Sequence, residues 1–276
     1  MSEGKVFSSV HDGILKSGGG FFYVQYRGVL FPYWCSKKEQ ASDTLTVFFP
    51  GSTRREKPLP IFMRQTFAPE IPSDVICVAD PSLFYSRNIT MAWFAGGPSF
   101  HYAAAVGVML NQFLRLNQQY KKVLLYGTSA GGIPALQVGK VINDIPVIVC
   151  VGNAQLNIFS YYRQHRLKFF QDIFPKLDEA VIGPKIANRL NMNGYAAECE
   201  VICMQNVDDK HHYEHHYLPF KSSFASPGKG TFIEYSDPDL GHSPLPKNIE
   251  IQLIRYLLTS DVSPYRDVPG AQVSKF

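Results

Sequence analysis

The sequence predicts an α/β fold whose central sheet is mostly parallel, is flanked by helices and begins with an antiparallel hairpin. After residue 40, short apolar segments alternate with segments of helical periodicity, which is typical of parallel strands joined by helices. Before that point, aromatic segments at residues 21–26 and 29–34 flank Arg27-Gly28, a spacing that predicts a β-hairpin. With 276 residues and 45% hydrophobic side chains, the chain can bury the core of one large domain.

The elements of this sheet follow one another along the chain. We expect strands at residues 45–49, 75–79, 123–126, 146–151, 201–205 and 231–235, the last of these being the final strand. We expect helices at residues 102–120, 133–138 and 248–258. Residues 158–196 differ, because basic side chains alternate there with Phe, Leu and Ile, which predicts a helical cap inserted over the sheet. Residues 1–276 would then form a single domain.

A strand, a tight glycine turn and a helix meet around Ser129. The apolar residues 123–126 lead into Gly-Thr-Ser-Ala-Gly at residues 127–131, a Gly-x-Ser-x-Gly pattern, and residues 133–138 continue as a helix. In this context the turn presents the serine hydroxyl at the carboxyl edge of the sheet, as the nucleophile elbow of α/β hydrolases does. The sequence therefore predicts an α/β-hydrolase fold with Ser129 as its nucleophile.

A serine nucleophile needs a histidine base and an acid, which in this fold follow it along the chain in the order acid, histidine. His242 lies in a Gly-His-Ser-Pro loop after the predicted final strand, where the base is expected. The acid should follow the strand at 201–205, where Asp208 and Asp209 occur. We favour Asp209, which lies farther past the strand end, and keep Asp208 as the alternative.

An oxyanion hole in this fold combines the N–H after the nucleophile with an N–H from an earlier loop. The first donor would be Ala130. Ser52 and Thr53, which follow the strand at 45–49, are the natural second donors, and the glycine-rich residues 95–98 are a lower-ranked alternative.

The basic residues Arg54 and Arg55 come directly after this loop. They are either a solvated surface or a clamp for an anionic substrate or donor phosphate. The net charge of +4 is mild and no polybasic tract occurs, so we expect no nucleic-acid partner.

Four histidines gather at residues 211–216, directly after the predicted acid. His211 and His215, like His212 and His216, are four positions apart, a spacing that would place two imidazoles on one helix face. The cluster could support the site, contact substrate or donor (with His212 as the candidate), or bind a metal. No third ligand is evident, so we expect no metal site.

Five scattered cysteines without paired spacing, and no segment of 18 apolar residues, favour a cytoplasmic protein with reduced, buried thiols. The N-terminus also lacks the apolar core of a signal peptide. A peripheral position on a membrane assembly is compatible with these features.

Three segments resemble bacterial capsular polysaccharide O-acetyltransferases of the meningococcal serogroup A capsule type. They are residues 124–136, residues 152–158 with Tyr161-Tyr162, and residues 206–213. The resemblance covers residues ~120–245 in pattern. Where the family often reads Asn-Pro-Gln, this chain has Asn153-Ala-Gln155.

The resemblance implies a triad of Ser129, Asp209 and His242, with Asn153 and Gln155 as candidate substrate or donor contacts. It also implies acetyl transfer from acetyl-CoA, as co-substrate, to a hydroxyl of a polysaccharide acceptor, near a capsule-assembly complex and without a bound cofactor. An esterase would share every step up to the acyl-enzyme, so a serine esterase or hydrolase is the alternative. A non-catalytic scaffold of a capsule or secretion complex is the second alternative.

Overall fold

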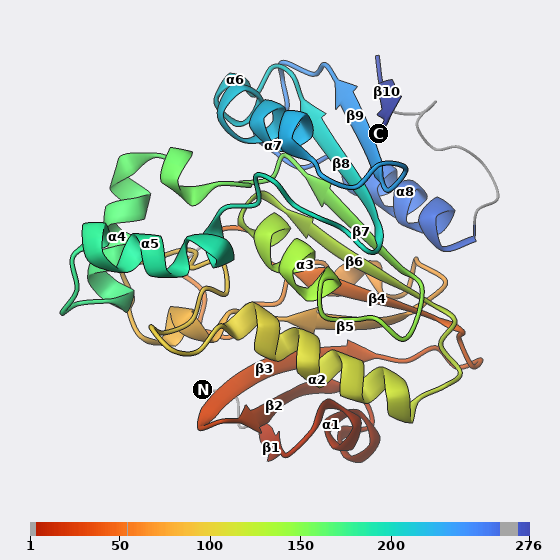
Figure 1. The fold of residues 1–276 in the computed structure, drawn as a ribbon. Coiled ribbons are helices and arrows are strands. Elements are labelled where there is room, and N and C mark those ends of the chain that lie inside the picture. The colour runs from red at the N-terminus through yellow and green to blue at the C-terminus, as the bar shows by residue number, and fades with distance from the viewer. Residues whose placement is uncertain (1–3, 54, 260–269) are drawn as a thin grey trace.

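A mixed sheet runs through the chain, which this computed structural model describes over residues 4–53, 55–259 and 270–276 (Figure 1). Within these residues ten strands form one sheet, in the order β1-β2-β3-β5-β4-β6-β7-β8-β9-β10. The strands are β1 (Lys5–Phe7), β2 (Gly20–Tyr26), β3 (Val29–Ser36), β4 (Thr44–Phe49), β5 (Asp74–Val78), β6 (Lys122–Thr128), β7 (Val147–Gly152), β8 (Glu200–Asn206), β9 (Gly230–Tyr235) and β10 (Gln272–Lys275). The helices are α1 (Val10–Ser17), α2 (Tyr102–Leu116), α3 (Gly132–Gly139), α4 (Arg163–Ile173), α5 (Glu179–Leu190), α6 (Lys210–His212), α7 (Leu218–Ser223) and α8 (Lys247–Thr259).

The centre of the sheet is parallel, as predicted. Strands β5, β4, β6, β7, β8 and β9 pair in parallel, whereas β2 and β3 form the predicted antiparallel hairpin and β3 pairs antiparallel with β5. The expectation that residues 231–235 form the final strand is wrong, because β10 pairs antiparallel with β9. Strand β10 is short and mostly exposed, so its sequence lacks the apolar alternation that marks a strand.

Helices cover both faces of the sheet, with α1, α2 and α3 on one side and α8 on the other (Figure 1). Strand β6 shows why two apolar layers are needed. Val123 and Leu125 belong to the core under α2 and α3, whereas Leu124 and Tyr126 belong to the core under α8. Alternate residues of a strand point to opposite faces, so this central strand is buried on both. All five cysteines are buried and unpaired.

The segment between β7 and β8 is helical. It contains a 3-10 turn (Ile158–Ser160), α4 and α5, which extend to one side of the sheet beyond α3 (Figure 1). Arg189 of α5 ties this segment to the loop before α2, because its guanidinium donates to the carbonyls of Ala95 at 3.1 Å and Gly97 at 2.7 Å. The predicted helical insert is therefore connected to the glycine-rich residues 95–98.

Candidate active site

Ser129 occupies a sharp turn between β6 and α3, at the centre of the sheet. Its φ of 54° lies in the left-handed region, which is strained for a residue with a side chain. The two flanking glycines permit the turn because nearby backbone carbonyl groups leave no room for a side chain at either position. A Cβ on Gly127 would lie 2.1 Å from the carbonyl oxygen of Gly131, and a Cβ on Gly131 would lie 2.6 Å from that of Phe49. The sequence Gly-x-Ser-x-Gly is thus what this backbone requires.

The structure brings the predicted serine, histidine and acid together in a hydrogen-bonded chain. Ser129 Oγ lies 2.9 Å from His242 Nε2, and Asp209 Oδ2 accepts a hydrogen bond from His242 Nδ1 at 2.6 Å. Because the carboxylate requires the hydrogen on Nδ1, Nε2 is left as the acceptor that can take the serine proton. The alternative acid, Asp208, instead accepts from the Ser236 hydroxyl at 2.7 Å.

Asp209 is shared by a second imidazole, that of His212. Asp209 Oδ1 accepts from His212 Nδ1 at 2.9 Å, and the His212 ring stacks on His242 with centroids 3.8 Å apart. Burial opposes ionisation of Asp209, but the hydrogen bonds from His212 and His242 outweigh it and hold the pKa of this carboxyl below its usual range. Burial also lowers the pKa of His212, so this imidazole stays neutral beside the base.

Of the remaining histidines of the cluster, His211 belongs to α6, and His215 and His216 lie in the π-helical turn (Tyr213–Tyr217) that follows it. His216 is fully buried, and its Nδ1 accepts the backbone N–H of Asn157 at 3.3 Å. The three groups whose ligand atoms approach closely enough for a metal ion, among the described residues, are Asp209, His212 and His242. These atoms already pair with one another as N–H donors and a carboxylate, so the residues fit a hydrogen-bonded site.

Two buried asparagines hold the loops that carry His242 and Asp209. The Asn153 amide donates to the carbonyl of Ser243 at 3.0 Å, and its oxygen accepts the backbone N–H of Asn206 at 2.8 Å. The Asn206 amide in turn donates to the carbonyl of Gly241 at 2.9 Å. Asn153, a predicted substrate contact, therefore bonds to the residue directly after the base, although it also lines the cavity beside it.

A cavity of about 630 Å³ opens at Ser129 and His242. Gly51 and Ser52 line it, and the assignment of Ala130 and Ser52 as oxyanion donors stays a prediction. The prediction that Thr53 supplies such a donor is wrong, because its N–H donates to the carbonyl of Thr90 at 2.8 Å and is not free to bind an oxyanion.

A buried ion pair that we did not predict forms part of the cavity wall. Arg64 Nη2 lies 2.7 Å from Glu250 Oε1, with both side chains almost completely buried, and the same nitrogen donates to Thr128 Oγ1 at 3.0 Å. Tyr126 also donates to Glu250 at 2.7 Å. Arg64 and Glu250 are far apart in the sequence, and no motif marks either one.

Of the two predicted clamp residues, Arg55 does not line this cavity. Arg55 donates to the carbonyls of Leu83 at 3.3 Å and Ser86 at 2.9 Å. Arg54 lies outside the residues that the structure describes. Gln155, by contrast, reaches the nucleophile, because its Nε2 donates to Ser129 Oγ at 3.1 Å.

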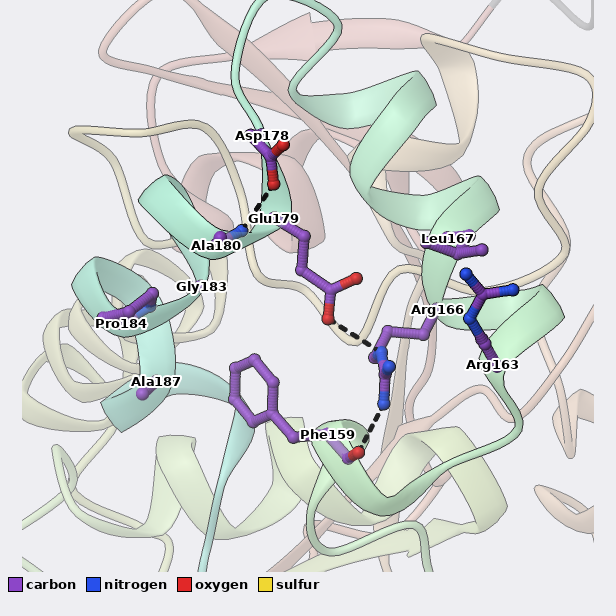
Figure 2. Close-up of a pocket in the computed structure, with 10 residues that line it drawn as sticks. All are labelled: Phe159, Arg163, Arg166, Leu167, Asp178, Glu179, Ala180, Gly183, Pro184 and Ala187. Atoms are coloured by element: carbon purple, nitrogen blue, oxygen red, sulfur yellow. Dashed lines mark hydrogen bonds and ion pairs between the residues drawn. The ribbon is translucent and has the colours of Figure 1, made fainter.

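A second cavity of about 550 Å³ lies within the helical insert. Figure 2 shows Arg166 of α4 reaching Glu179 at the start of α5, and their ion pair measures 2.8 Å. The ring of Phe159 lies between these helices, and the exposed Arg163 stands at the edge (Figure 2). None of the residues that line this second cavity also lines the cavity at Ser129.

No family model and no curated protein matches the chain, whereas solved structures share its fold. The capsule O-acetyltransferase of Neisseria meningitidis serogroup A matches with a TM-score of 0.56 and 12% identity, over 84% of this chain and 96% of that one. The 2,6-dihydroxy-pseudo-oxynicotine hydrolase matches with a TM-score of 0.62 and 10% identity, over 89% and 70%. Mouse alpha/beta hydrolase domain-containing protein 10 matches with a TM-score of 0.55 and 12% identity, over 87% and 97%.

These identities establish the fold alone. The chain therefore has the predicted α/β-hydrolase fold, with a mostly parallel sheet flanked by helices.

No helix within the described residues has the length and apolar character needed to cross a membrane.

Proposed function

We propose that this protein is a serine acyltransferase that moves an acetyl group from acetyl-CoA to a hydroxyl of a bacterial capsular or surface polysaccharide. The observation that carries the proposal is the hydrogen-bonded chain from Ser129 through His242 to Asp209, at a turn held in the left-handed region. The motif resemblance and the fold shared with a capsule O-acetyltransferase support the choice of donor and acceptor.

The reaction would proceed in two halves through an acyl-enzyme. In the first, Ser129 Oγ bonds to the acetyl carbonyl carbon as its proton passes to His242 Nε2. The bond from that carbon to the CoA sulfur then breaks, and the thiolate takes the proton from His242. In the second half, His242 takes the proton of a sugar hydroxyl whose oxygen bonds to the acyl carbon, and the released Ser129 Oγ recovers the proton.

The N–H groups of Ala130 and Ser52 would stabilise the negative oxygen formed in each half. Asp209 would remain ionised and hold the imidazolium, because its hydrogen bonds already favour the charged carboxylate.

A serine esterase or hydrolase is the second candidate. The side chain of His242 is 38% exposed, so water can approach the base and deacylate Ser129 in place of a sugar hydroxyl. The fold shared with a hydrolase at a TM-score of 0.62 agrees with this alternative.

Mass spectrometry of the protein incubated with acetyl-CoA, beside the Ser129→Ala variant, separates the two candidates. We expect one added acetyl group, or release of free CoA, with the wild type alone. Absence of both, with p-nitrophenyl acetate still cleaved through Ser129, would favour the esterase. Unchanged turnover in folded Ser129→Ala would overturn both.

A further inference from the structure

Ser129 has a second polar neighbour besides His242. The side chain of Gln155 is fully buried, and its Nε2 donates to Ser129 Oγ at 3.1 Å. Its backbone N–H also donates to the carbonyl of Ser129, at 3.0 Å. Because an amide nitrogen only donates, the serine oxygen accepts from Gln155 and directs its own hydrogen to His242.

The orientation of this amide is fixed by Trp93. An indole N–H is a donor only, and Trp93 Nε1 donates to Gln155 Oε1 at 2.7 Å. The oxygen of the amide must therefore face Trp93 and its nitrogen must face Ser129. If the amide were flipped, its NH₂ group would face the indole N–H, so that two donors would oppose each other, and no N–H would point at Ser129.

Trp93 is held in this position by a strained backbone and a packed ring. Trp93 and Phe94 have φ values of 52° and 51°, which are unfavourable for two bulky residues. The buried carboxylate of Asp80 stabilises this turn by accepting the N–H of Phe94 at 2.7 Å. Phe169 of α4 packs edge-on against the indole, with centroids 5.2 Å apart. The surrounding structure thus maintains an unfavourable conformation that places the indole against Gln155.

We propose that Gln155 is a catalytic residue that stabilises negative charge on the serine oxygen itself, and that Trp93 is its positioning residue. As the hydroxyl proton passes to His242, charge develops on Oγ, and the amide N–H already points at that atom. When the acyl-enzyme breaks down, the electron pair of the C–Oγ bond returns to Oγ, and the same N–H stabilises it. The oxyanion donors act on a different atom, the carbonyl oxygen of the acyl group. This role rests on Ser129 being the nucleophile of the proposed function.

The rate at which a fluorophosphonate labels Ser129, followed by intact mass against pH, tests this role without knowledge of the substrate. We expect Gln155→Ala to lower the rate by about 10²-fold, the loss typical when one preorganised donor is removed. Gln155→Glu keeps the shape but places a carboxylate near His242, so the pH midpoint of labelling should rise as well. Gln137, a buried glutamine that donates to the carbonyl of Asn188, is the matched control, and Gln137→Ala should label normally.

Trp93→Phe removes the indole N–H and retains an aromatic ring against α4. We expect an intermediate loss of labelling rate, and no further loss when Trp93→Phe is added to Gln155→Ala, because both changes remove one interaction. Thermal unfolding of each variant verifies that it is folded.

The two proposals fail in different ways. If Gln155→Ala labels within twofold of the wild type at an unchanged pH midpoint, the role of Gln155 is overturned while Ser129 remains the nucleophile. If the effects of Trp93→Phe and Gln155→Ala are additive, the positioning role of Trp93 is overturned. If the folded wild type is not labelled at Ser129 at all, both the nucleophile and the role of Gln155 are overturned.

Discussion

Asp209→Asn probes how one carboxylate serves two imidazoles. The carboxylate accepts from Nδ1 of His242 at 2.6 Å and from Nδ1 of His212 at 2.9 Å. A carboxamide of the same shape offers only one oxygen, so one imidazole faces an NH₂ group and moves its hydrogen to Nε2. Where that imidazole is His242, its Nε2 carries a hydrogen and cannot accept the proton of Ser129.

We expect this change to lower turnover by about 10⁴-fold, which corresponds to a barrier higher by about 5.5 kcal/mol. The magnitude applies here because Asp209 is buried, at 8% exposure, so no water replaces the lost acceptor. Asp208→Asn is the matched control at the adjacent position. The Asp208 carboxylate accepts a hydrogen bond from a serine hydroxyl at an exposed position, so we expect turnover to fall by less than about threefold. This corresponds to the roughly 0.5 kcal/mol that a surface substitution typically costs.

The assays are cleavage of p-nitrophenyl acetate and fluorophosphonate labelling, with thermal unfolding as the measure of folding. Adding His212→Phe to Asp209→Asn should recover part of the rate, because the single amide oxygen then faces His242 without competition. A folded Asp209→Asn within tenfold of the wild type would refute this reasoning, and so would an equal loss in Asp208→Asn.

Three further changes test the turn, the supporting amides and the buried histidines. Gly127→Ala should abolish activity and lower the free energy of unfolding by about 1–3 kcal/mol, because the added Cβ meets the carbonyl of Gly131. Gly97→Ala, which has open space around the added Cβ, should change neither activity nor stability, and thermal unfolding distinguishes the two variants. Asn153→Ala should lower both turnover and stability, the latter by about 2 kcal/mol in urea unfolding, because it leaves buried partners unpaired; a fully stable, fully active variant would contradict this. Burial lowers the pKa of His216 from 6.5 to about 2, so the unfolded chain alone takes up this proton as the pH falls below 6.5. The free energy of unfolding therefore falls by about 2.7 kcal/mol between neutral pH and pH 4.5 because of this one group. The free energy of unfolding of His216→Phe, measured against pH, should lack this contribution.

The central strands and the serine turn could be predicted because local sequence determines them. The apolar residues 123–126 alternate between two cores, and the glycines at 127 and 131 satisfy close contacts within the same turn. His242 and Asp209 could be placed near Ser129 from chain order, because in this fold each follows the carboxyl end of a parallel strand.

The rest of the site depends on contacts between residues remote in sequence. Arg64 and Glu250 are 186 positions apart, and Trp93 and Gln155 are 62 apart. Neither pair has a sequence pattern. Arg64, from the segment after β4, meets Glu250 of α8, and Trp93 and Gln155 come from segments that follow different strands. Chain order predicts the location of the loop that carries Thr53. It does not predict whether the Thr53 N–H is free, because that depends on its hydrogen-bond partner, the carbonyl of Thr90.

The loop after β7 illustrates how few residues fix this geometry. Asn153 bonds to the segment that follows His242, and Gln155, two positions later, bonds to Ser129. Ala154 between them packs so closely on the elbow helix that a Cβ on Gly132 would lie 2.5 Å from its own Cβ. Glycine is therefore required at position 132, against the centre of a loop that carries an amide on each side. Through one tripeptide, the positions of the nucleophile and the base become mutually dependent, so a backbone shift at residue 154 would disturb both at once.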